Sequence, residues 1–383
     1  MKQSLDILEK LVAFPTVSSS SNLTMIAYLH DFLSQRGFDL HQIADSSGKK
    51  SGLFASLGPS GDGGILLSGH TDVVPTQGQH WTHPDFKLTV EGGRAYGRGT
   101  TDMKGYLACM LTAADAASKL TLKRPLKLAF SFDEEIGCVG IAQMIDHLVP
   151  NIGLPEMVIV GEPTSMQVAI GHKGKAAIRA TCRGQNGHSA LAPKFVNALH
   201  IATDFVSGLR ELQNKLATSG ARDEAYAIPY STLHVGKLQG GIALNIVPDT
   251  ATIDFEYRHL AADSGDELMA QITQLADRVA ARYQKDFPGA AIELDRYNTY
   301  PGLDVSVEQP VVATVQHLAQ TNTSTKVAFG TEAGYFDQLG IPTVVCGPGC
   351  MEEQGHKPDE SIALDELAAC DAMMQRVVQS LCI

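Results

Sequence analysis

Apolar runs that end at a His, Asp or Glu recur over nearly the whole chain. They are GILLSGHTD (64–72), GTTDMKG (99–105), LAFSFDEE (128–135), VIVGEPT (158–164) and TVVCGPG (343–349), the last followed by GHKPDE (355–360). Runs of this kind are typical of buried strands in a parallel sheet. Open α/β sheets build their sites at the carboxyl ends of such strands. The pattern therefore predicts one site assembled from distant segments.

The composition narrows the class of protein. With 383 residues, 44% of them hydrophobic, the chain is long enough for two domains. A net charge of −12 without a block of Lys or Arg makes nucleic acid and anionic membrane poor partners. The start, MKQSLDILEKLVAF, lacks the pattern of a signal or transit peptide. Seven cysteines without a CxxC pair indicate reduced thiols, and we expect a cytoplasmic protein.

The order of expected elements indicates an α/β domain that a second domain interrupts. Up to about residue 174, helices alternate with apolar strands, as in a sheet flanked by helices. The pattern then becomes strand 176–182, helix 197–216, strands 231–238 and 250–258, helix 266–283 and strand 290–296. This βαββαβ order is ferredoxin-like. We expect a catalytic domain of mainly parallel sheet in two parts, 1–174 and 289–383, around an inserted domain over 175–288.

His70 and Asp102 lie in segments whose local pattern suits a metal site. Asp72 stands two residues after His70, so both side chains project to one side of an extended segment. Asp72 can then accept the ring N–H of His70 and orient it. Asp102 lies among glycines, in a loop that lets its carboxylate bridge two ions. The alternative is that Asp102 caps the helix that follows.

Further acidic residues follow two other strands. Glu134 and Glu135 come directly after Asp133, and adjacent carboxylates repel one another unless a cation neutralises them. One of the pair would bind metal and the other would move protons. Glu162 follows a very apolar strand, and His356 lies in a loop rich in Gly and Pro. Each of these residues alone also fits a solvated surface loop.

Together, these residues indicate a metal site more strongly than any one of them does alone. Nitrogen and oxygen ligands of this kind suit zinc or a similar divalent ion. Two such ions carry four positive charges, which Asp102, Glu135, Glu162 and one hydroxide balance. Two ions ~3.5–4 Å apart bring the pKa of a bound water towards ~7. The sequence therefore predicts a hydrolase with two metal ions.

Several strings resemble the dizinc aminoacylase and carboxypeptidase family of metallopeptidases over essentially the whole chain. They are DEEIGCVG (133–140), VGEPTSM (160–166), GHKGK (171–175), NIVPD (245–249), GTEAG (330–334), and CGPG (346–349) with GHKPDE (355–360). The resemblance implies two zinc ions per subunit, with cobalt as a possible substitute. It places one ion on His70, Asp102 and Glu162, and the other on Asp102, Glu135 and His356. Gly355 stands where the family usually has Ala, which reduces local rigidity and leaves the ligand in place.

The same resemblance implies the remaining roles in catalysis. Glu134 would be the general base, and Asp72 the orienting partner of His70. The inserted domain would be a lid that forms a homodimer, and His188 in GQNGHSA would reach into the partner subunit's site. The implied reaction is hydrolysis of N2-acetyl-L-ornithine to acetate and L-ornithine, a step of arginine biosynthesis. The alternatives are desuccinylation of succinyl-diaminopimelate, a broad N-acyl-amino-acid or dipeptide hydrolase, and a non-catalytic metal-binding relative.

Three more residues are candidates for binding the substrate. Arg258 would clamp the α-carboxylate, because Arg binds planar carboxylates with two hydrogen bonds; the alternative is a surface arginine near the lid edge. Asn245 would donate to the same carboxylate or to the oxyanion, or it is a turn residue. Glu332 would meet the ammonium of the substrate side chain, or it sits at the start of a helix.

Overall fold

The computed structural model describes residues 1–383 and consists of two units. The first unit comprises Met1–Gly171, Leu303–Val327 and Thr331–Ile383, and the second comprises His172–Gly302 and Ala328–Gly330. The inserted domain was expected to end at residue 288, and this boundary is wrong. Strand β14 (Ala291–Tyr300) pairs with β9 (Gly174–Arg183), so it belongs to the sheet of the second unit.

A nine-stranded sheet forms the centre of the first unit, in the order β1-β2-β6-β3-β7-β17-β8-β15, with β16 beside β8. Its strands are β1 (Asp39–Ala44), β2 (Ser51–Leu57), β3 (Ile65–His70), β6 (Leu126–Ser131), β7 (Met157–Pro163), β8 (Val168–His172), β15 (Leu303–Asp304), β16 (Ser324–Val327) and β17 (Thr343–Gly347). The central strands β6, β3, β7 and β17 run parallel, and β1, β2 and β8 pair antiparallel to their neighbours. The α/β class is confirmed.

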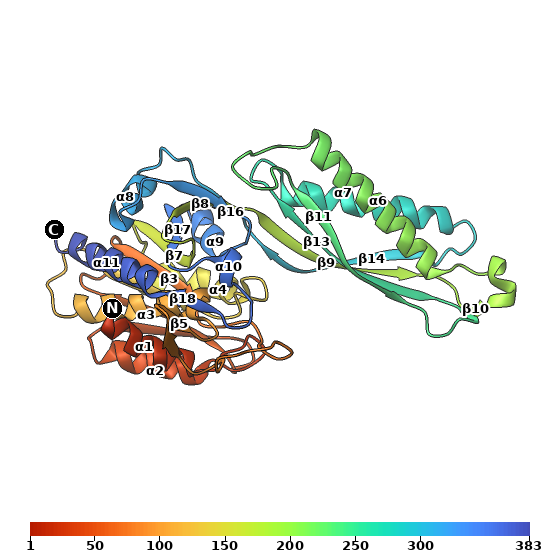
Figure 1. The fold of residues 1–383 in the computed structure, drawn as a ribbon. Coiled ribbons are helices and arrows are strands. Elements are labelled where there is room, and N and C mark those ends of the chain that lie inside the picture. Colours follow the sequence, from red (N-terminus) through yellow and green to blue (C-terminus); the bar gives the residue numbers. More distant parts are fainter. The chain divides into compact units, whose positions relative to one another are not determined.

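Helices cover both faces of this sheet. They are α1 (Lys2–Val12), α2 (Leu23–Ser34), α3 (Gly105–Ala117), α4 (Val139–Met144), α5 (Leu148–Ile152), α8 (Pro310–Ala319), α9 (Ala333–Gln338) and α11 (Leu364–Ser380). Figure 1 shows α3 between α1 and α11, which both contact it. Gly69 faces α3, whereas Gly52 faces Met144 of α4 on the opposite side. None of the helices combines the length and the apolar character that a membrane span requires.

A small sheet joins two distant loops of the first unit. Strands β4 (Thr89–Glu91), β5 (Arg94–Tyr96) and β18 (Ser361–Ala363) pair antiparallel in the order β18-β5-β4. The short helix α10 (Met351–Gln354) precedes β18. Because β18 pairs with β5, the loop that precedes β18 lies beside the loop that follows β5. No pattern in the sequence indicates this sheet.

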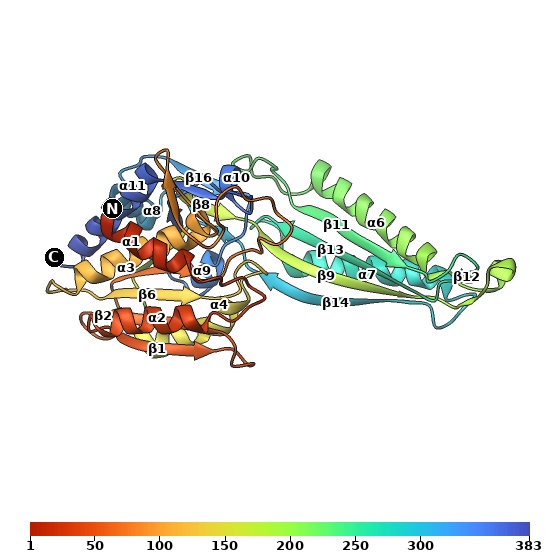
Figure 2. The same ribbon diagram turned by 60° about the horizontal axis from the view of Figure 1, so that its bottom comes forward.

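The second unit is a four-stranded antiparallel sheet covered on one face by two helices (Figures 1 and 2). The strand order is β11-β13-β9-β14, and the chain order, β9-α6-β11-β13-α7-β14, is the expected ferredoxin-like βαββαβ arrangement. The remaining elements are β11 (Thr232–Gly240), β13 (Thr250–His259), α6 (Ala198–Ser219), α7 (Gly265–Tyr283), the 3-10 helix η3 (Ser189–Lys194) and the pair β10 (Gly187–His188) and β12 (Ile246–Val247). Alternate residues of β13, from Ala251 to Tyr257, are buried in the core with Phe205 of α6 and Ile272 of α7.

Candidate metal centre

His70 and Glu162 lie at the same level on neighbouring parallel strands. Ser68 of β3 is in register with Val160 of β7, so the residues two positions further on, His70 and Glu162, share one face. We expected both residues just beyond their strands, but each is still part of its strand. The glycine before each ligand faces α3. A Cβ at Gly161 would lie 2.0 Å from the Tyr106 ring, so this glycine allows the helix to approach.

Asp102 reaches the same point from the turn that precedes α3. The turn, η1 (Thr100–Lys104), is a single π-helical turn in which Asp102 has non-helical φ and ψ of −122° and 91°. The alternative role of Asp102 as a helix cap is wrong, because α3 begins at Gly105 with no side-chain cap.

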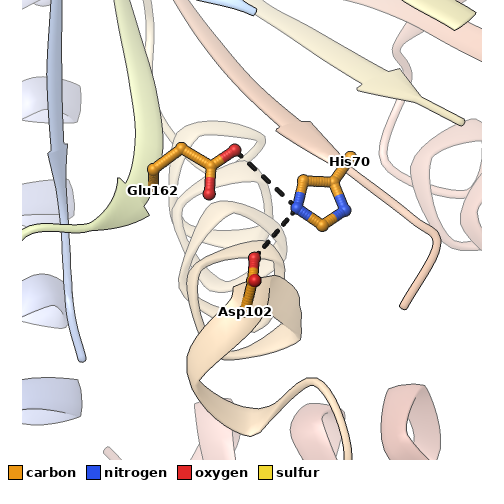
Figure 3. A group of neighbouring side chains, drawn as sticks. All are labelled: His70, Asp102 and Glu162. Atoms are coloured by element: carbon orange, nitrogen blue, oxygen red, sulfur yellow. Dashed lines mark hydrogen bonds and ion pairs between the residues drawn. The ribbon is translucent and has the colours of Figure 1, made fainter. Parts of the chain in front are cut away.

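The expected ligands form two groups that share Asp102. In the first, His70 Nε2 lies 3.1 Å from Asp102 Oδ1 and 3.7 Å from Glu162 Oε1 (Figure 3). In the second, His356 Nε2 lies 3.3 Å from Asp102 Oδ2 and 3.0 Å from Glu135 Oε2. In each group the possible ligand atoms lie within 4.8 Å of one another. Asp102 thus offers one carboxylate oxygen to each group, as a bridging ligand must.

The donor set fits two divalent cations. Oε1 of Glu135 and Oε1 of Glu162 are buried without a hydrogen-bond partner. No Lys or Arg pairs with either residue or with Asp102; only the two imidazoles do. Burial raises the pKa of Glu135 to about 7 and raises the pKa of Glu162 well above its usual value. Buried carboxylates without a counter-charge are costly, and two bound cations would supply that charge.

Asp72 connects the His70 strand to the turn that carries the two glutamates. The Nδ1 atom of His70 lies 2.9 Å from the backbone carbonyl of Asp72 and 3.5 Å from its carboxylate. The carboxylate accepts hydrogen bonds from the backbone N–H groups of Glu134, at 3.1 Å, and Glu135, at 3.3 Å. Ser18 donates a third, at 2.7 Å. Asp72 is therefore beside His70 as expected, and it also fixes the backbone of the next two functional residues.

Glu134 lies beside the ligand groups and belongs to neither. Burial raises the pKa of its carboxyl group well above the usual value, and the neighbouring carboxylates Glu135 and Asp102 add to the shift against the opposing effect of His70. The thiol of Cys138 contacts Glu134 Oε1 at 3.5 Å. A carboxylate that holds no metal in a group of metal ligands is free to exchange a proton.

Glu360 is a further buried residue of the candidate site, and no sequence pattern marks it. Its carboxylate accepts hydrogen bonds from the backbone N–H groups of Gly99, Thr101 and Asp102, at 2.8–3.0 Å. It also pairs with Arg98 at 2.8 Å, and both side chains are 1% exposed. Glu360 ends the GHKPDE string, but nothing in that string marks it as buried. The contacts join the loop of Asp102 to the loop of His356.

Three of the remaining candidate residues belong to the second unit. His188, Asn245 and Arg258 lie in the second unit, outside the two ligand groups. His188 Nδ1 accepts the backbone N–H of Ala190 at 3.1 Å, so the ring hydrogen is on Nε2. The Arg258 guanidinium donates to Glu256 at 3.0 Å and to the Tyr300 hydroxyl at 3.4 Å.

Glu332 lies in the first unit, at the N-cap of α9, and is 1% exposed. Burial raises the pKa of its carboxyl group to about 7, while the Ser131 hydroxyl and the charge of His70 lower it. No cationic side chain pairs with this carboxylate. Its position at the N-cap agrees with the alternative interpretation, a residue at the start of a helix.

Comparison with known proteins identifies the family. The profile of peptidase family M20/M25/M40 matches residues 66–380. The chain belongs to this family. It is therefore a hydrolase whose ligand geometry matches a dinuclear metal centre. Acetylornithine deacetylase of Pasteurella multocida is 32% identical to this M20 chain, over 99% of the chain and 98% of that protein. The same enzyme of Proteus mirabilis is 31% identical, over 99% and 97%.

Several solved structures share the fold. An M20 metallo-carboxypeptidase of Sulfolobus solfataricus superposes with a TM-score of 0.79 at 20% identity, covering 99% of each chain. A tripeptidase of Staphylococcus aureus gives 0.77 at 19%, covering 100% of this chain and 98% of its own. A dinuclear metal-binding peptidase of Bacillus subtilis gives 0.67 at 16%, covering 99% and 98%. At these identities the likeness concerns the fold.

Proposed function

We propose that this chain hydrolyses N2-acetyl-L-ornithine to acetate and L-ornithine, with two zinc ions per subunit, as a cytoplasmic enzyme of arginine biosynthesis. Two observations support the proposal together. Acetylornithine deacetylases match 99% of the chain at 31–32% identity. The second observation is the position of Asp102, whose two carboxylate oxygens each lie in one ligand group, as a residue that bridges two metal ions requires.

Residues of the first unit would bind the metal ions and transfer the proton. His70, Asp102 and Glu162 would hold one ion, and Asp102, Glu135 and His356 would hold the other. Two divalent ions bound there would polarise the acyl carbonyl and make a bound water acidic; cobalt would substitute for zinc. Glu134 would take a proton from the attacking water and return it to the departing amine. Its raised pKa suits both steps.

Three further residues would recognise the substrate. Arg258 would bind the α-carboxylate, and Asn245 would donate a hydrogen bond to the same group or to the oxyanion. Glu332 would favour the cationic side chain of ornithine. Because Glu332 is buried and its pKa is raised to about 7, it would act through the partial negative charge that its carboxyl group carries near neutral pH, rather than as an exposed contact. Its carboxylate has no cationic side chain to neutralise it.

A homodimer formed by the second unit would complete the site. The Nε2–H group of His188 is a hydrogen-bond donor on an exposed residue, suited to stabilise the oxyanion of the partner subunit. His188 pairs with Ile246 in the β10–β12 ribbon. Ile242 and Leu244, in the loop before β12, are 89% and 101% exposed. Exposed apolar residues next to the proposed catalytic donor favour a protein contact at this ribbon.

Turnover of a panel of substrates tests the proposal. Acetylornithine, succinyl-diaminopimelate, neutral N-acetyl amino acids and dipeptides are assayed with zinc and with cobalt. We expect the highest kcat/KM for acetylornithine. Replacing Glu134 with Gln should keep the metal content and reduce kcat by at least about a hundredfold. Near-normal turnover by this variant would end the assignment of the base, and a higher kcat/KM for another substrate would replace the assignment of the substrate.

A further inference from the structure

The thiol of Cys138 contacts the residue that we propose as the general base. Its Sγ atom lies 3.5 Å from Oε1 of Glu134. Cys138 is 1% exposed, and it precedes α4 as the N-cap residue. Burial and the negative charge of Glu134 raise the pKa of the thiol well above its usual value, so the sulfur carries its hydrogen at neutral pH. The contact is therefore an S–H group that donates to a carboxylate oxygen.

The backbone between the two residues holds this contact in place. The backbone N–H groups of Gly137 and Cys138 both donate to the carbonyl of Glu134, at 2.8 Å each. Cys138 has a φ of 57°, in the left-handed region that side chains other than glycine rarely adopt. At the other end, the N–H of Glu134 donates to Asp72. The turn from Glu134 to Cys138 is thus fixed at both ends, and the thiol points back to the carboxylate.

We propose that Cys138 is a positioning residue for Glu134: its thiol binds Oε1 and leaves Oε2 as the oxygen that exchanges the proton. The inference rests on the proposed role of Glu134. A carboxylate at the end of a flexible side chain rotates among several rotamers. A hydrogen bond on one oxygen restricts that rotation, and misplacement of a catalytic group by about 1 Å lowers the rate steeply. Cys138 itself belongs to neither ligand group.

Three substitutions at Cys138 distinguish the effect of its thiol from the effect of its backbone conformation. Cys138→Gly removes the donor and suits the positive φ, so this variant is expected to fold. Cys138→Ala also removes the donor, and Cys138→Ser retains one. We expect kcat to fall by about tenfold in the Gly and Ala variants, with KM and the number of bound zinc ions unchanged. The Ser variant should keep most of the wild-type kcat. Cys182→Ala, which removes a fully buried thiol of the second unit, is the matched control and should leave kcat unchanged.

The outcomes distinguish this inference from the proposed function. If Glu134→Gln abolishes turnover while the Gly and Ala variants keep the wild-type kcat, the positioning role is wrong and the base is right. A Ser variant as slow as Ala would also overturn the role, because it retains a donor. If Glu134→Gln remains active, the proposed base fails first and the positioning role fails with it. A loss of zinc in the Gly variant would show a structural effect on the site and contradict the inference.

Discussion

The carboxylate of Glu360 accepts a hydrogen bond of 3.0 Å from the backbone N–H of Asp102, although 258 residues separate the two. The same carboxylate binds two more N–H groups of the 99–102 loop, and it pairs with Arg98. Glu360 therefore holds the loop that positions Asp102 between the two ligand groups. Since His356 lies only four positions before Glu360, this contact also joins the loops that carry two of the proposed metal ligands.

Replacing Glu360 with Gln should weaken metal binding without removing a ligand. The amide cannot accept from all three N–H groups and neutralise Arg98, so the loop of Asp102 loses its fixed position. Substitutions that disturb the support of a ligand typically reduce metal affinity by about ten- to a hundredfold. Zinc titration in a metal buffer measures the change. The control is Asp371→Asn, because Asp371 is also a buried carboxylate but lies on α11. Wild-type affinity in a folded Glu360→Gln protein would contradict this role.

The sequence predicts the ligands better than it predicts what supports them. His70, Glu135 and Glu162 stand at or near the ends of strands, which a parallel sheet brings to one edge, whereas Asp102 and His356 come from loops. The residues that position these ligands show no comparable pattern in the sequence.

Glu360 and Cys138 illustrate the difficulty, because their roles depend on contacts with backbone N–H groups or with a side chain fixed by a turn. The expected end of the inserted domain is also wrong. The expected strand 290–296 completes the βαββαβ order, but the boundary at 288 leaves it outside the inserted domain, and the pairing of β14 with β9 places it inside.

Replacing Glu332 with Gln tests the proposed selectivity for a cationic side chain. The substitution keeps the size of the side chain and removes its charge. We expect kcat/KM for acetylornithine to fall relative to that for a neutral N-acetyl amino acid, because the positive end of the substrate loses an attractive charge. The ratio of the two kcat/KM values is the measurement, and it cancels any general loss of activity. An unchanged ratio would remove Glu332 from the selectivity determinants.

Mixing two inactive variants tests whether His188 acts in the partner subunit. Glu134→Gln and His188→Ala are each expected to be nearly inactive as homodimers. In a mixed dimer, one site would carry both substitutions and the other would carry none. After subunits exchange at random, about a quarter of the wild-type activity should return. If His188 served its own subunit, or if the protein were a monomer, the mixture would stay as inactive as its parts.

His172 should make the stability of the protein depend on pH between about 6.5 and 4. The ring is 1% exposed; its Nδ1 donates to the carbonyl of Lys173 at 3.2 Å, and its Nε2 has no partner. Burial, with a smaller effect of the Arg258 charge, lowers the pKa of His172 from 6.5 to about 4. Above pH 6.5 the ring is neutral in the folded and the unfolded states. As the pH falls towards 4, only the unfolded state binds the proton, so stability is lost.

The expected loss follows from the size of the shift. A lowering of this extent corresponds to about 3 kcal/mol in the free energy of unfolding between the two pH values. Urea unfolding of the metal-free protein at several pH values measures it, with chelator present so that loss of metal does not contribute. His172→Gln should flatten the dependence by about this amount, whatever its effect on stability at pH 7. His200→Gln, an exposed histidine of α6, is the control and should follow the wild-type curve. Equal slopes for His172→Gln and the wild type would show that the buried ring does not govern the acid sensitivity of the fold.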